Sequence, residues 1–367
     1  MAIRVAINGF GRIGRAFVRA SVHDPDTDIV AINDLGDIEN LAYLLRHDSV
    51  YRNFVGQVGV EKSVSGVAGA AFAVAASPTG GSIPEASVQG SLVLGAKRIV
   101  VLSEKDPANL PWKSLNIDVV VESTGFFTDY AKAKAHVDAG AKRVVISAPA
   151  KDSTEAGVNG VTVLMGVNEQ KLATSALSSN ASCTTNAASP LIAILDATLG
   201  IEKALLSTTH GYTASQSLVD GPSKKDMKEG RAAAQNIVPT ATGAAIAVTQ
   251  AYEQLKGKFD GISLRVPVPA GSIADITFIS KRTTTAEEVN KILEDASKEE
   301  RWKGIFTVTR EPLVSSDIIG EPYGSIADLA LTRVVGGNLV KVLAWYDNEM
   351  GYAHTLVRHV KEAGKHV

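Results

Sequence analysis

The sequence predicts two domains, an α/β domain with a doubly wound parallel sheet followed by an α+β domain with a mixed or antiparallel sheet. Three observations predict this division. The chain has 367 residues, which is too long for one ordinary hydrophobic core, and its 45% hydrophobic and 21% charged residues are typical of a globular protein. Up to about residue 147, short β-branched runs alternate with helix-like segments. Beyond about residue 180, longer strand-like segments predominate.

In the first half, the predicted strands are apolar on both faces. They lie at 5–7, 29–32, 119–121 and 144–146. Such runs suit a parallel sheet that is buried between helices. The segment from Gly56 to Gly95 differs, because it contains 8 glycines, 7 alanines and only 3 charged residues. We expect this extended segment to form loops or short hairpin strands.

In the second half, the predicted strands are longer and are interrupted by two helical stretches. They lie at 203–210, 259–269, 274–280, 305–309 and 338–345. The last segment, 351–365, has apolar residues at helical spacing, and we expect it to pack back on the first domain. The predicted division is therefore 1–181, 182–347 and a C-terminal helix at 348–367.

Composition narrows the possible partners and compartments. The formal net charge of -2 gives no electrostatic reason to expect nucleic acid or an anionic membrane as a partner. The first strand begins near residue 3 and no apolar stretch approaches the roughly 20 residues of a membrane span, so we expect a cytoplasmic protein. Cys183 is the single cysteine, which excludes an internal disulfide. The seven histidines show no metal-ligand spacing, so no metal is expected, and His354 and His359 are interpreted as solvated surface residues.

A glycine-rich motif follows the first strand and leads into a helix. It comprises Gly9, Phe10, Gly11, Arg12, Ile13 and Gly14. Such glycines let the backbone approach a pyrophosphate at the amino end of a helix. Asp34 lies 20 residues beyond Gly14, at the end of the next predicted strand. Its carboxylate would bind ribose hydroxyls and repel a 2′-phosphate, so the context predicts a Rossmann-type NAD site rather than an NADP site.

Cys183 and His210 are the candidate nucleophile and base. Cys183 precedes a helix-like stretch that contains Pro190, and a position at a helix start is expected to lower the pKa of its thiol. His210 stands where a β-branched strand runs into a glycine-containing loop. A lone cysteine is more often a packing residue, and a lone histidine is usually structural. The pairing is a hypothesis because a cofactor site, a cysteine at a helix start and this histidine occur on one chain.

Six segments of the chain resemble those of phosphorylating glyceraldehyde-3-phosphate dehydrogenases in order and spacing. They are 8–15 (NGFGRIGR), 179–186 (SNASCTTN), 208–213 (TTHGYT), 230–233 (GRAA), 239–245 (PTATGAA) and 345–352 (WYDNEMGY). The extended segment near 56–95 lacks a good counterpart. Ala187 stands where many relatives carry a second cysteine, and Ser215 where they often carry threonine, asparagine or aspartate.

The resemblance implies oxidative phosphorylation of D-glyceraldehyde 3-phosphate with NAD and inorganic phosphate, as in glycolysis. Cys183 would attack the aldehyde to form a hemithioacetal, and His210 would activate the sulfur and take the hydroxyl proton as hydride leaves. Phosphate would then release the acyl group from the resulting thioester. The resemblance also implies a homotetramer.

The resemblance implies further site residues, each at its own position in this sequence. Those for substrate and phosphate are Ser182, Thr184, Thr213, Arg231, Thr242, Gly243 and Arg265. Those for the cofactor, besides the glycine motif and Asp34, are Lys105, Thr124, Gly125, Ser147, Asn348 and Tyr352.

Two alternatives remain at this point. An erythrose-4-phosphate dehydrogenase would use the same thiolate but release an acid by hydrolysis. A non-catalytic NAD-binding or RNA-binding protein would keep the cofactor fold without the chemistry.

Overall fold

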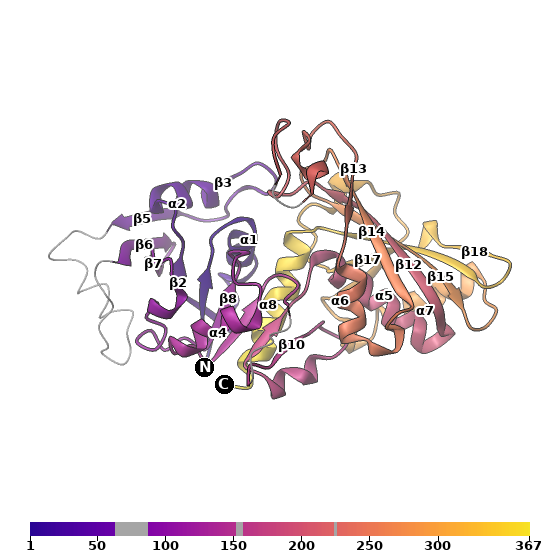
Figure 1. The fold of residues 1–367 in the computed structure, drawn as a ribbon, viewed down its shortest axis with the longest axis horizontal. Coiled ribbons are helices and arrows are strands. Elements are labelled where there is room, and N and C mark those ends of the chain that lie inside the picture. The colour runs from indigo at the N-terminus through magenta and orange to yellow at the C-terminus, as the bar shows by residue number, and fades with distance from the viewer. Residues whose placement is uncertain (63–86, 152–156, 224–225) are drawn as a thin grey trace. The chain divides into compact units, whose positions relative to one another are not determined.

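The computed structural model describes residues 1–62, 87–151, 157–223 and 226–367, which form two compact units (Figure 1). The first unit comprises Met1–Val163, Gln170–Asn180 and Leu356–Val367. The second comprises Leu164–Glu169 and Ala181–Thr355. None of the described helices combines the length and the apolar character that crossing a bilayer requires.

The described part of the first unit contains a nine-stranded sheet in the order β10-β11-β9-β8-β1-β2-β7-β6-β5. The parallel strands are β1 (Ile3–Asn8), β2 (Thr27–Asn33), β7 (Lys97–Leu102), β8 (Val119–Glu122), β9 (Arg143–Ile146), β10 (Gly160–Thr162) and β11 (Leu177–Ser179). At one edge, β5 (Val58–Lys62) and β6 (Val88–Leu94) pair antiparallel. The prediction of a doubly wound sheet is confirmed, with this antiparallel edge added.

The order of the strands reverses between β1 and β8. From β1 the chain builds outward through β2 and β7, whereas from β8 it builds the other way through β9, β11 and β10. Ligands of doubly wound sheets bind outside the carboxyl ends of the strands at such a switch point. The helices of this unit are α1 (Arg12–Ser21), α2 (Ile38–Arg46) and α4 (Tyr130–Asp138), and a small separate sheet pairs β3 (His47–Asp48) with β4 (Arg52–Asn53).

The extended segment is described only at its two ends. These ends are β5 and β6, which form the antiparallel pair that hairpin strands would give. The rest of the segment, residues 63–86, lies outside the described residues.

The C-terminal helix α8 (Met350–Gly364) begins in the second unit, and its last nine residues belong to the first. His359 is fully buried there, which corrects the expectation of a solvated residue. Its Nε2 lies 2.9 Å from the Ser178 hydroxyl, and its Nδ1 lies 3.1 Å from the Asn180 side-chain oxygen. Because Nδ1 donates to that oxygen, Nε2 accepts from Ser178, and the imidazole is neutral. Burial lowers the pKa of His359 to about 3.

The second unit is built on a mixed sheet in the order β13-β14-β12-β15-β19-β17-β16, with β18 on β19. Its strands are β12 (Ile201–Gly211), β13 (Val238–Ala241), β14 (Phe259–Val266), β15 (Ser272–Ser280), β16 (Phe306–Thr309), β17 (Ser325–Asp328), β18 (Arg333–Val335) and β19 (Leu339–Tyr346). Its helices are α5 (Cys183–Leu199), α6 (Ala244–Ala251) and α7 (Ala286–Ala296). The predicted α+β domain is confirmed. Alternate residues of β15 are buried, so one face of the sheet packs on the core.

Short 3₁₀ turns connect these elements. They are η2 (Pro107–Asn109), η3 (Glu169–Thr174), η4 (Met227–Gly230), η5 (Glu253–Leu255), η6 (Glu300–Trp302), η7 (Ser315–Ile318) and η8 (Leu329–Leu331).

Candidate active site

Cys183 is the first residue of helix α5, as the sequence predicted. The side chain of Ser182 caps the helix by accepting a 3.1 Å hydrogen bond from the Thr185 amide. Ala181, just before the cap, has a φ of 54°, a left-handed conformation that few residues other than glycine adopt. The chain therefore turns sharply into the helix and presents Cys183 beside amides that have no partner within the helix.

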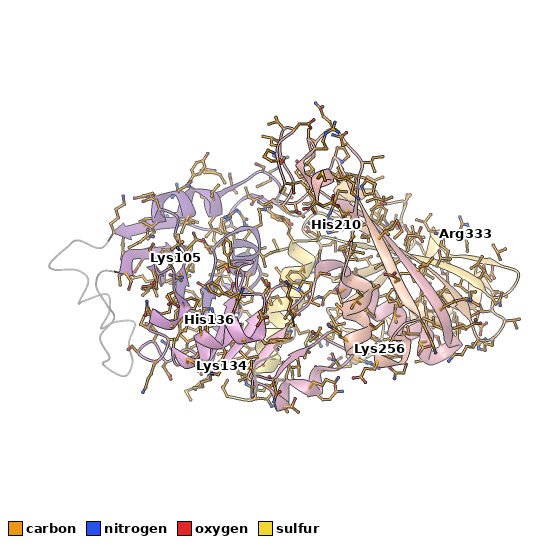
Figure 2. All side chains as sticks on the ribbon, in the orientation of Figure 1. Lys105, Lys134, His136, His210, Lys256 and Arg333 are labelled. Carbon is orange, nitrogen blue, oxygen red and sulfur yellow. The ribbon has the colours of Figure 1, made fainter. Side chains whose placement is uncertain are left out.

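His210 lies at the end of β12 (Figure 2). Its Nε2 is 3.3 Å from the Sγ of Cys183. Arg265 is its partner in the parallel register of β14, so the two side chains share the buried face of the sheet. The structure thus brings together three predicted residues that are far apart in the chain.

The Nδ1 of His210 lies between two groups. It is 2.6 Å from the Gly211 carbonyl oxygen and 2.6 Å from Nη1 of Arg265. In a neutral imidazole this nitrogen either donates to the carbonyl or accepts from the guanidinium. The first arrangement leaves Nε2 unprotonated and able to take the thiol proton. The second places the proton on Nε2, from which it donates to the sulfur.

Burial dominates the electrostatics of the pair. Desolvation, followed by the charge of Arg265, lowers the pKa of His210 to about 3. Desolvation also raises the pKa of the Cys183 thiol, although Arg265 and the amide and hydroxyl of Thr184 act in the opposite direction. The expectation of a lowered thiol pKa is therefore wrong for the chain alone, because the helix start offsets burial only in part. At neutral pH the pair is a thiol beside a neutral imidazole.

Tyr346 is a buried residue beside the pair that sequence reasoning did not single out. Its hydroxyl is 2.8 Å from the Thr184 hydroxyl and 2.7 Å from the Thr208 hydroxyl. Its ring meets the imidazole of His210 edge to face, with centroids 5.9 Å apart. Burial, with the nearby sulfur of Cys183, raises the pKa of the phenol. The residue lies within the matched segment 345–352, but only the fold shows what it touches.

Asn348 has a fixed amide orientation. Its Oδ1 accepts from the Gly271 amide at 3.0 Å and from the Ser272 hydroxyl at 3.1 Å. Ser272 also accepts from the Gly211 amide at 3.2 Å, which connects Asn348 to the end of the strand that carries His210. Because two donors surround Oδ1, the oxygen and the nitrogen of the Asn348 amide can be told apart. The NH₂ group is on the side away from Gly271 and Ser272.

Tyr352 is also buried, on the first turns of α8. Its hydroxyl donates to the Ala181 carbonyl at 3.1 Å. The hydrogen bond holds the turn that precedes Cys183. Tyr352 is 3% exposed, so its ring has almost no free surface with which to contact a ligand.

The predicted anion-binding residues differ in their exposure and in their hydrogen-bond partners. Arg231 is exposed and pairs with Asp220, its Nε 2.9 Å from the carboxylate. Thr213 lies 3.1 Å from Ser215 through their hydroxyls, and Thr242 accepts from Ala244 at the start of α6. A Cβ at Gly243 would meet nothing within 4 Å. The hydroxyls of Ser182 and Thr184 are already hydrogen-bonded within the protein, to Thr185 and Tyr346 respectively.

In the first unit, the glycine motif forms the loop between β1 and α1. Gly9 has a φ of 96°, and a Cβ there would lie 2.6 Å from the Thr124 amide nitrogen. A Cβ at Gly14 would lie 2.3 Å from the Gly9 carbonyl oxygen, whereas one at Gly11 would meet nothing within 4 Å. Gly11 begins the helix without a side-chain cap. The loop therefore offers open space and uncapped helix amides, which fit a pyrophosphate.

Asp34 is held against this loop. Its carboxylate accepts from the Phe10 amide at 2.6 Å and from the Gly36 amide at 2.8 Å. It is therefore positioned at the end of β2, where a ribose of a dinucleotide would lie, and the residues present fit that cofactor.

Some of the other predicted cofactor residues of this unit follow the ends of sheet strands, and others lie on α1 or on an exposed loop. Arg12 turns its guanidinium to Asp48 and over the ring of Tyr51. Lys105 is exposed in the loop after β7 (Figure 2). Thr124 and Gly125 follow β8, Ser147 follows β9, and Ile13 is half-buried on α1.

Among the described residues, no group of three or more histidines, cysteines, aspartates or glutamates could hold a metal ion.

Comparisons with known proteins cover almost the whole chain. A model described as the C-terminal domain of glyceraldehyde 3-phosphate dehydrogenase matches residues 182–348. A model described as the NAD-binding domain of the same enzyme matches residues 3–84 and 81–130, and these two matches overlap inside the extended segment.

Full-length relatives give the same result. A glyceraldehyde-3-phosphate dehydrogenase of Streptomyces coelicolor is 44% identical over 360 residues, which is 97% of this chain and 97% of that protein. One of Mycobacterium avium is 45% identical over 372 residues, which is 100% of this chain and 99% of that protein. One of Mycobacterium leprae is 43% identical over 100% of this chain and 99% of its own length.

Proposed function

The chain belongs to the glyceraldehyde-3-phosphate dehydrogenase family, and we propose how its own residues perform the reaction. It is an NAD-dependent oxidoreductase of glycolysis that converts D-glyceraldehyde 3-phosphate and inorganic phosphate to 1,3-bisphosphoglycerate. The observation that carries the residue assignment is the 3.3 Å contact between Sγ of Cys183 and Nε2 of His210. A pseudoenzyme that kept only the cofactor fold would have no need for this contact.

His210 acts first on the thiol. In the tautomer with Nδ1–H donating to Gly211, the lone pair of Nε2 takes the proton of Cys183 as the sulfur bonds to the aldehyde carbon. This forms a hemithioacetal, in which the new C–S bond leaves the former carbonyl oxygen as an alkoxide. His210 returns its proton to that oxygen, which gives a hydroxyl and a neutral imidazole. NAD, when bound, supplies the hydride acceptor. His210 removes the hydroxyl proton in that step, and an acyl-thioester on Cys183 is left.

Inorganic phosphate then completes the reaction. A phosphate oxygen bonds to the acyl carbon, the C–S bond breaks, and the Cys183 thiolate regains a proton from His210. The amide of Cys183, at the start of α5, is a donor available to the oxyanion that forms on the carbonyl.

We assign the two phosphate groups to the predicted anion ligands of the second unit. Arg265 is the best supported, because it already contacts His210 and its guanidinium carries a fixed positive charge. Arg231, Thr213, Thr242 and Gly243 are proposed on their residue types and loop positions. Ser182 is proposed as a phosphate ligand because its amide and hydroxyl lie directly before Cys183. Thr184 is proposed to act through its amide, because its hydroxyl bonds to Tyr346.

The cofactor residues are proposed on the fit described above. In the second unit, the NH₂ group of Asn348 is available for the carboxamide of the nicotinamide, since its oxygen is occupied. In the first, the loop at 9–14 brings the uncapped amides at the start of α1 to the pyrophosphate, and Asp34 receives the ribose. Lys105, Thr124, Gly125 and Ser147 complete the proposed contacts, and Tyr352 is proposed to support the site by holding the turn before Cys183. We propose that residues 1–181 bind NAD, that residues 182–347 carry out catalysis and that residues 348–367 form the C-terminal helix.

A homotetramer in the cytoplasm is part of the proposal. The loop between β12 and β13 exposes the apolar residues Leu218, Val219 and Met227, which are 81%, 72% and 90% accessible. Apolar side chains gathered on one loop mark an interaction surface. Sedimentation velocity would give a single species of about four chain masses, and a monomer would contradict the assembly without affecting the chemistry.

The phosphate dependence of NADH formation tests the function. With NAD and D-glyceraldehyde 3-phosphate, NADH should form rapidly only when inorganic phosphate is present. Erythrose 4-phosphate is the matched second substrate. Faster oxidation of erythrose 4-phosphate that does not depend on phosphate would show the hydrolytic sister activity instead.

A further inference from the structure

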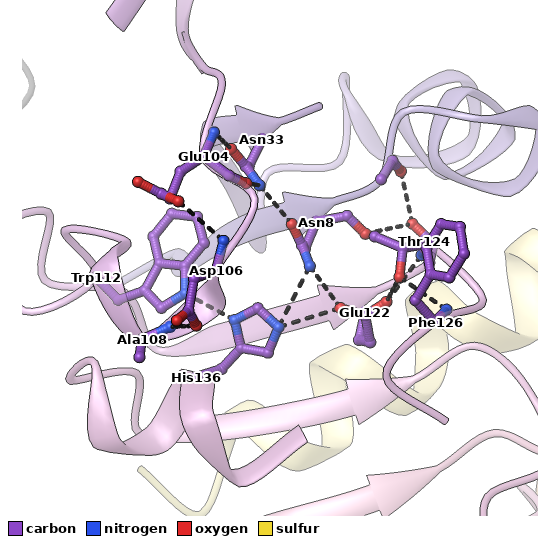
Figure 3. A network of polar contacts seen from close by, with 12 residues as sticks. Asn8, Asn33, Glu104, Asp106, Ala108, Trp112, Glu122, Thr124, Phe126 and His136 are labelled. Atoms are coloured by element: carbon purple, nitrogen blue, oxygen red, sulfur yellow. Dashed lines mark hydrogen bonds and ion pairs between the residues drawn. The ribbon is translucent and has the colours of Figure 1, made fainter. Parts of the chain in front are cut away.

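A row of buried polar side chains crosses the switch point of the first unit (Figure 3). Asn33, Asn8 and Glu122 are register partners at the carboxyl ends of β2, β1 and β8. Asn33 donates to Asn8 at 2.7 Å, and Asn8 donates to Glu122 at 2.6 Å. All three are at most 4% exposed. The row spans the three central strands below the crevice in which a doubly wound sheet binds its ligand.

Glu122 is the acceptor on which the row ends. One carboxylate oxygen accepts from the Asn8 amide and from Nε2 of His136, which is 3.1 Å away. The other accepts from the amide and the hydroxyl of Thr124, at 2.8 Å and 2.5 Å. Four donors therefore surround a carboxylate that is 2% exposed. A carboxylate accepts all four hydrogen bonds, whereas an amide or a carboxylic acid at the same place would oppose one donor with another.

Trp112 determines the tautomer of His136. The indole Nε1–H can only donate, and it lies 2.9 Å from Nδ1 of His136. Nδ1 must therefore be unprotonated, so the proton of the neutral imidazole is on Nε2, facing Glu122. His136 and Trp112 are both fully buried. The side-chain N–H groups of Asn8 and His136 are thus both directed to Glu122.

The network ends at the predicted cofactor loops. Thr124 is half-buried, and Glu122 holds both its backbone and its side chain. The Thr124 amide nitrogen would be 2.6 Å from a Cβ at Gly9, and the Ser123 hydroxyl donates to the Gly9 carbonyl at 2.7 Å. The loop after β8 and the glycine loop after β1 are therefore packed together, and a shift of one displaces the other.

We propose that Glu122, oriented by Asn8 and His136, is a positioning residue for NAD. Glu122 sets the distance between the loop at 124–125 and the glycine loop before NAD binds. The two loops therefore do not have to become ordered when the cofactor binds. Preorganisation of this kind raises affinity without a direct contact. The inference rests on the proposed function, because it deepens the assignment of both loops to the cofactor.

A purely structural role makes a different prediction. A buried polar network that only stabilises the unit would lower the melting temperature when broken and leave NAD affinity unchanged. Positioning requires that the dissociation constant for NAD change beyond any effect on melting. Steady-state kinetics add a second difference, because a misplaced loop raises KM for NAD more than it lowers kcat.

A charge swap tests the network with the full-length protein. Glu122→Gln places an amide donor against two donors, and Asn8→Asp places a second carboxylate 2.6 Å from the first. We expect each single change to weaken NAD binding by about tenfold. In the double variant, the new amide at position 122 can donate to the new carboxylate at position 8. That carboxylate still accepts from Asn33, and His136 is 3.4 Å from position 8. The double variant should therefore recover most of the affinity.

Single variants with the wild-type dissociation constant for NAD in titration calorimetry would overturn the inference, as would a double variant no better than the worse single. Trp112→Phe decides the matter if the Glu122 and Asn8 variants do not fold. Phenylalanine keeps an aromatic ring but loses the N–H that fixes the tautomer of His136, and this variant should bind NAD several-fold more weakly. A folded Trp112→Phe protein with the wild-type dissociation constant for NAD would overturn the inference.

Thr27→Val is the matched control. It removes a buried hydroxyl that donates to Ser21 in the same unit, outside the network, and should lower only the melting temperature. If the wild-type protein binds NAD and forms NADH but the variants bind equally well, only the positioning role fails. If the wild-type protein binds no NAD, the proposed cofactor site fails with it.

Discussion

Cys183 and His210 are 27 positions apart in the chain, yet Sγ of one lies 3.3 Å from Nε2 of the other. The contact arises because α5 begins where β12 ends, on the buried face of the second sheet. It joins a nucleophile whose pKa is raised to a base whose pKa is lowered, both by burial. Neither group is charged at neutral pH, so proton transfer between them must accompany the attack on the aldehyde.

Replacement of the sulfur should abolish turnover and spare cofactor binding. In Cys183→Ala no thioester can form, so we expect NADH formation to fall by several orders of magnitude. Cys183→Ser, whose hydroxyl is a far weaker nucleophile, should behave in the same way. Turnover is measured by NADH absorbance and NAD binding by calorimetry. Full turnover in the alanine variant would contradict the nucleophile assignment.

Removal of the cation beside the pair should change its pH dependence. The charge of Arg265 lowers the pKa values of both Cys183 and His210, so Arg265→Gln should raise both. Iodoacetamide reacts with the thiolate, and its rate rises as pH passes the thiol pKa. The alkylation profile of the variant should therefore move to higher pH. Arg333→Gln, an exposed arginine on β18, should leave the profile unchanged, and an unmoved profile in Arg265→Gln would refute the coupling.

The charge of Asp34 should determine cofactor choice. Asp34→Ala should mainly relax the preference for NAD, because the carboxylate that repels a 2′-phosphate is gone. Asp34→Asn keeps an oxygen that can accept from the Phe10 amide but removes the charge. It therefore distinguishes the effect of the charge from that of the hydrogen bond to the glycine loop. We expect kcat/KM with NADP to rise by about tenfold in both. Asp37→Asn, at the exposed start of α2, is the control. An unchanged NADP/NAD ratio in both Asp34 variants would show that discrimination resides elsewhere.

Buried His359 should make the protein sensitive to acid. Its pKa is about 3 in the folded chain and 6.5 as an unperturbed reference, so the unfolded state binds a proton that the folded state refuses. Stability from this group is complete above pH 6.5 and falls as pH drops toward 3. The loss between pH 7 and pH 5 is about 2 kcal/mol.

A non-titrating variant isolates that effect, since His210 contributes a loss of the same sign. His359→Gln should be less stable than the wild type at pH 7 and should lose less on acidification to pH 5. Urea unfolding at the two pH values measures the difference, and His23→Gln, at an exposed position, is the control. An identical acid loss in His359→Gln and the wild type would mean that His359 is not the sensitive group.

Features that depend on local pattern could be predicted from the amino-acid sequence. The glycine motif with Asp34, the apolar strand runs and the cysteine before a helix are each written within a few residues, because turns, strands and helix starts obey local backbone rules. Those rules were enough to predict the sheets, the cofactor class and the positions of Cys183 and His210.

Which distant groups meet, and in which protonation state, depends on how the whole chain folds. Asn8 and Glu122 are 114 positions apart and become neighbours through strand pairing, and Tyr346 reaches Thr184 across 162. Burial also overrode the sequence-based expectations for the Cys183 thiol and for His359. Desolvation depends on everything that packs around a group, and no local pattern records that.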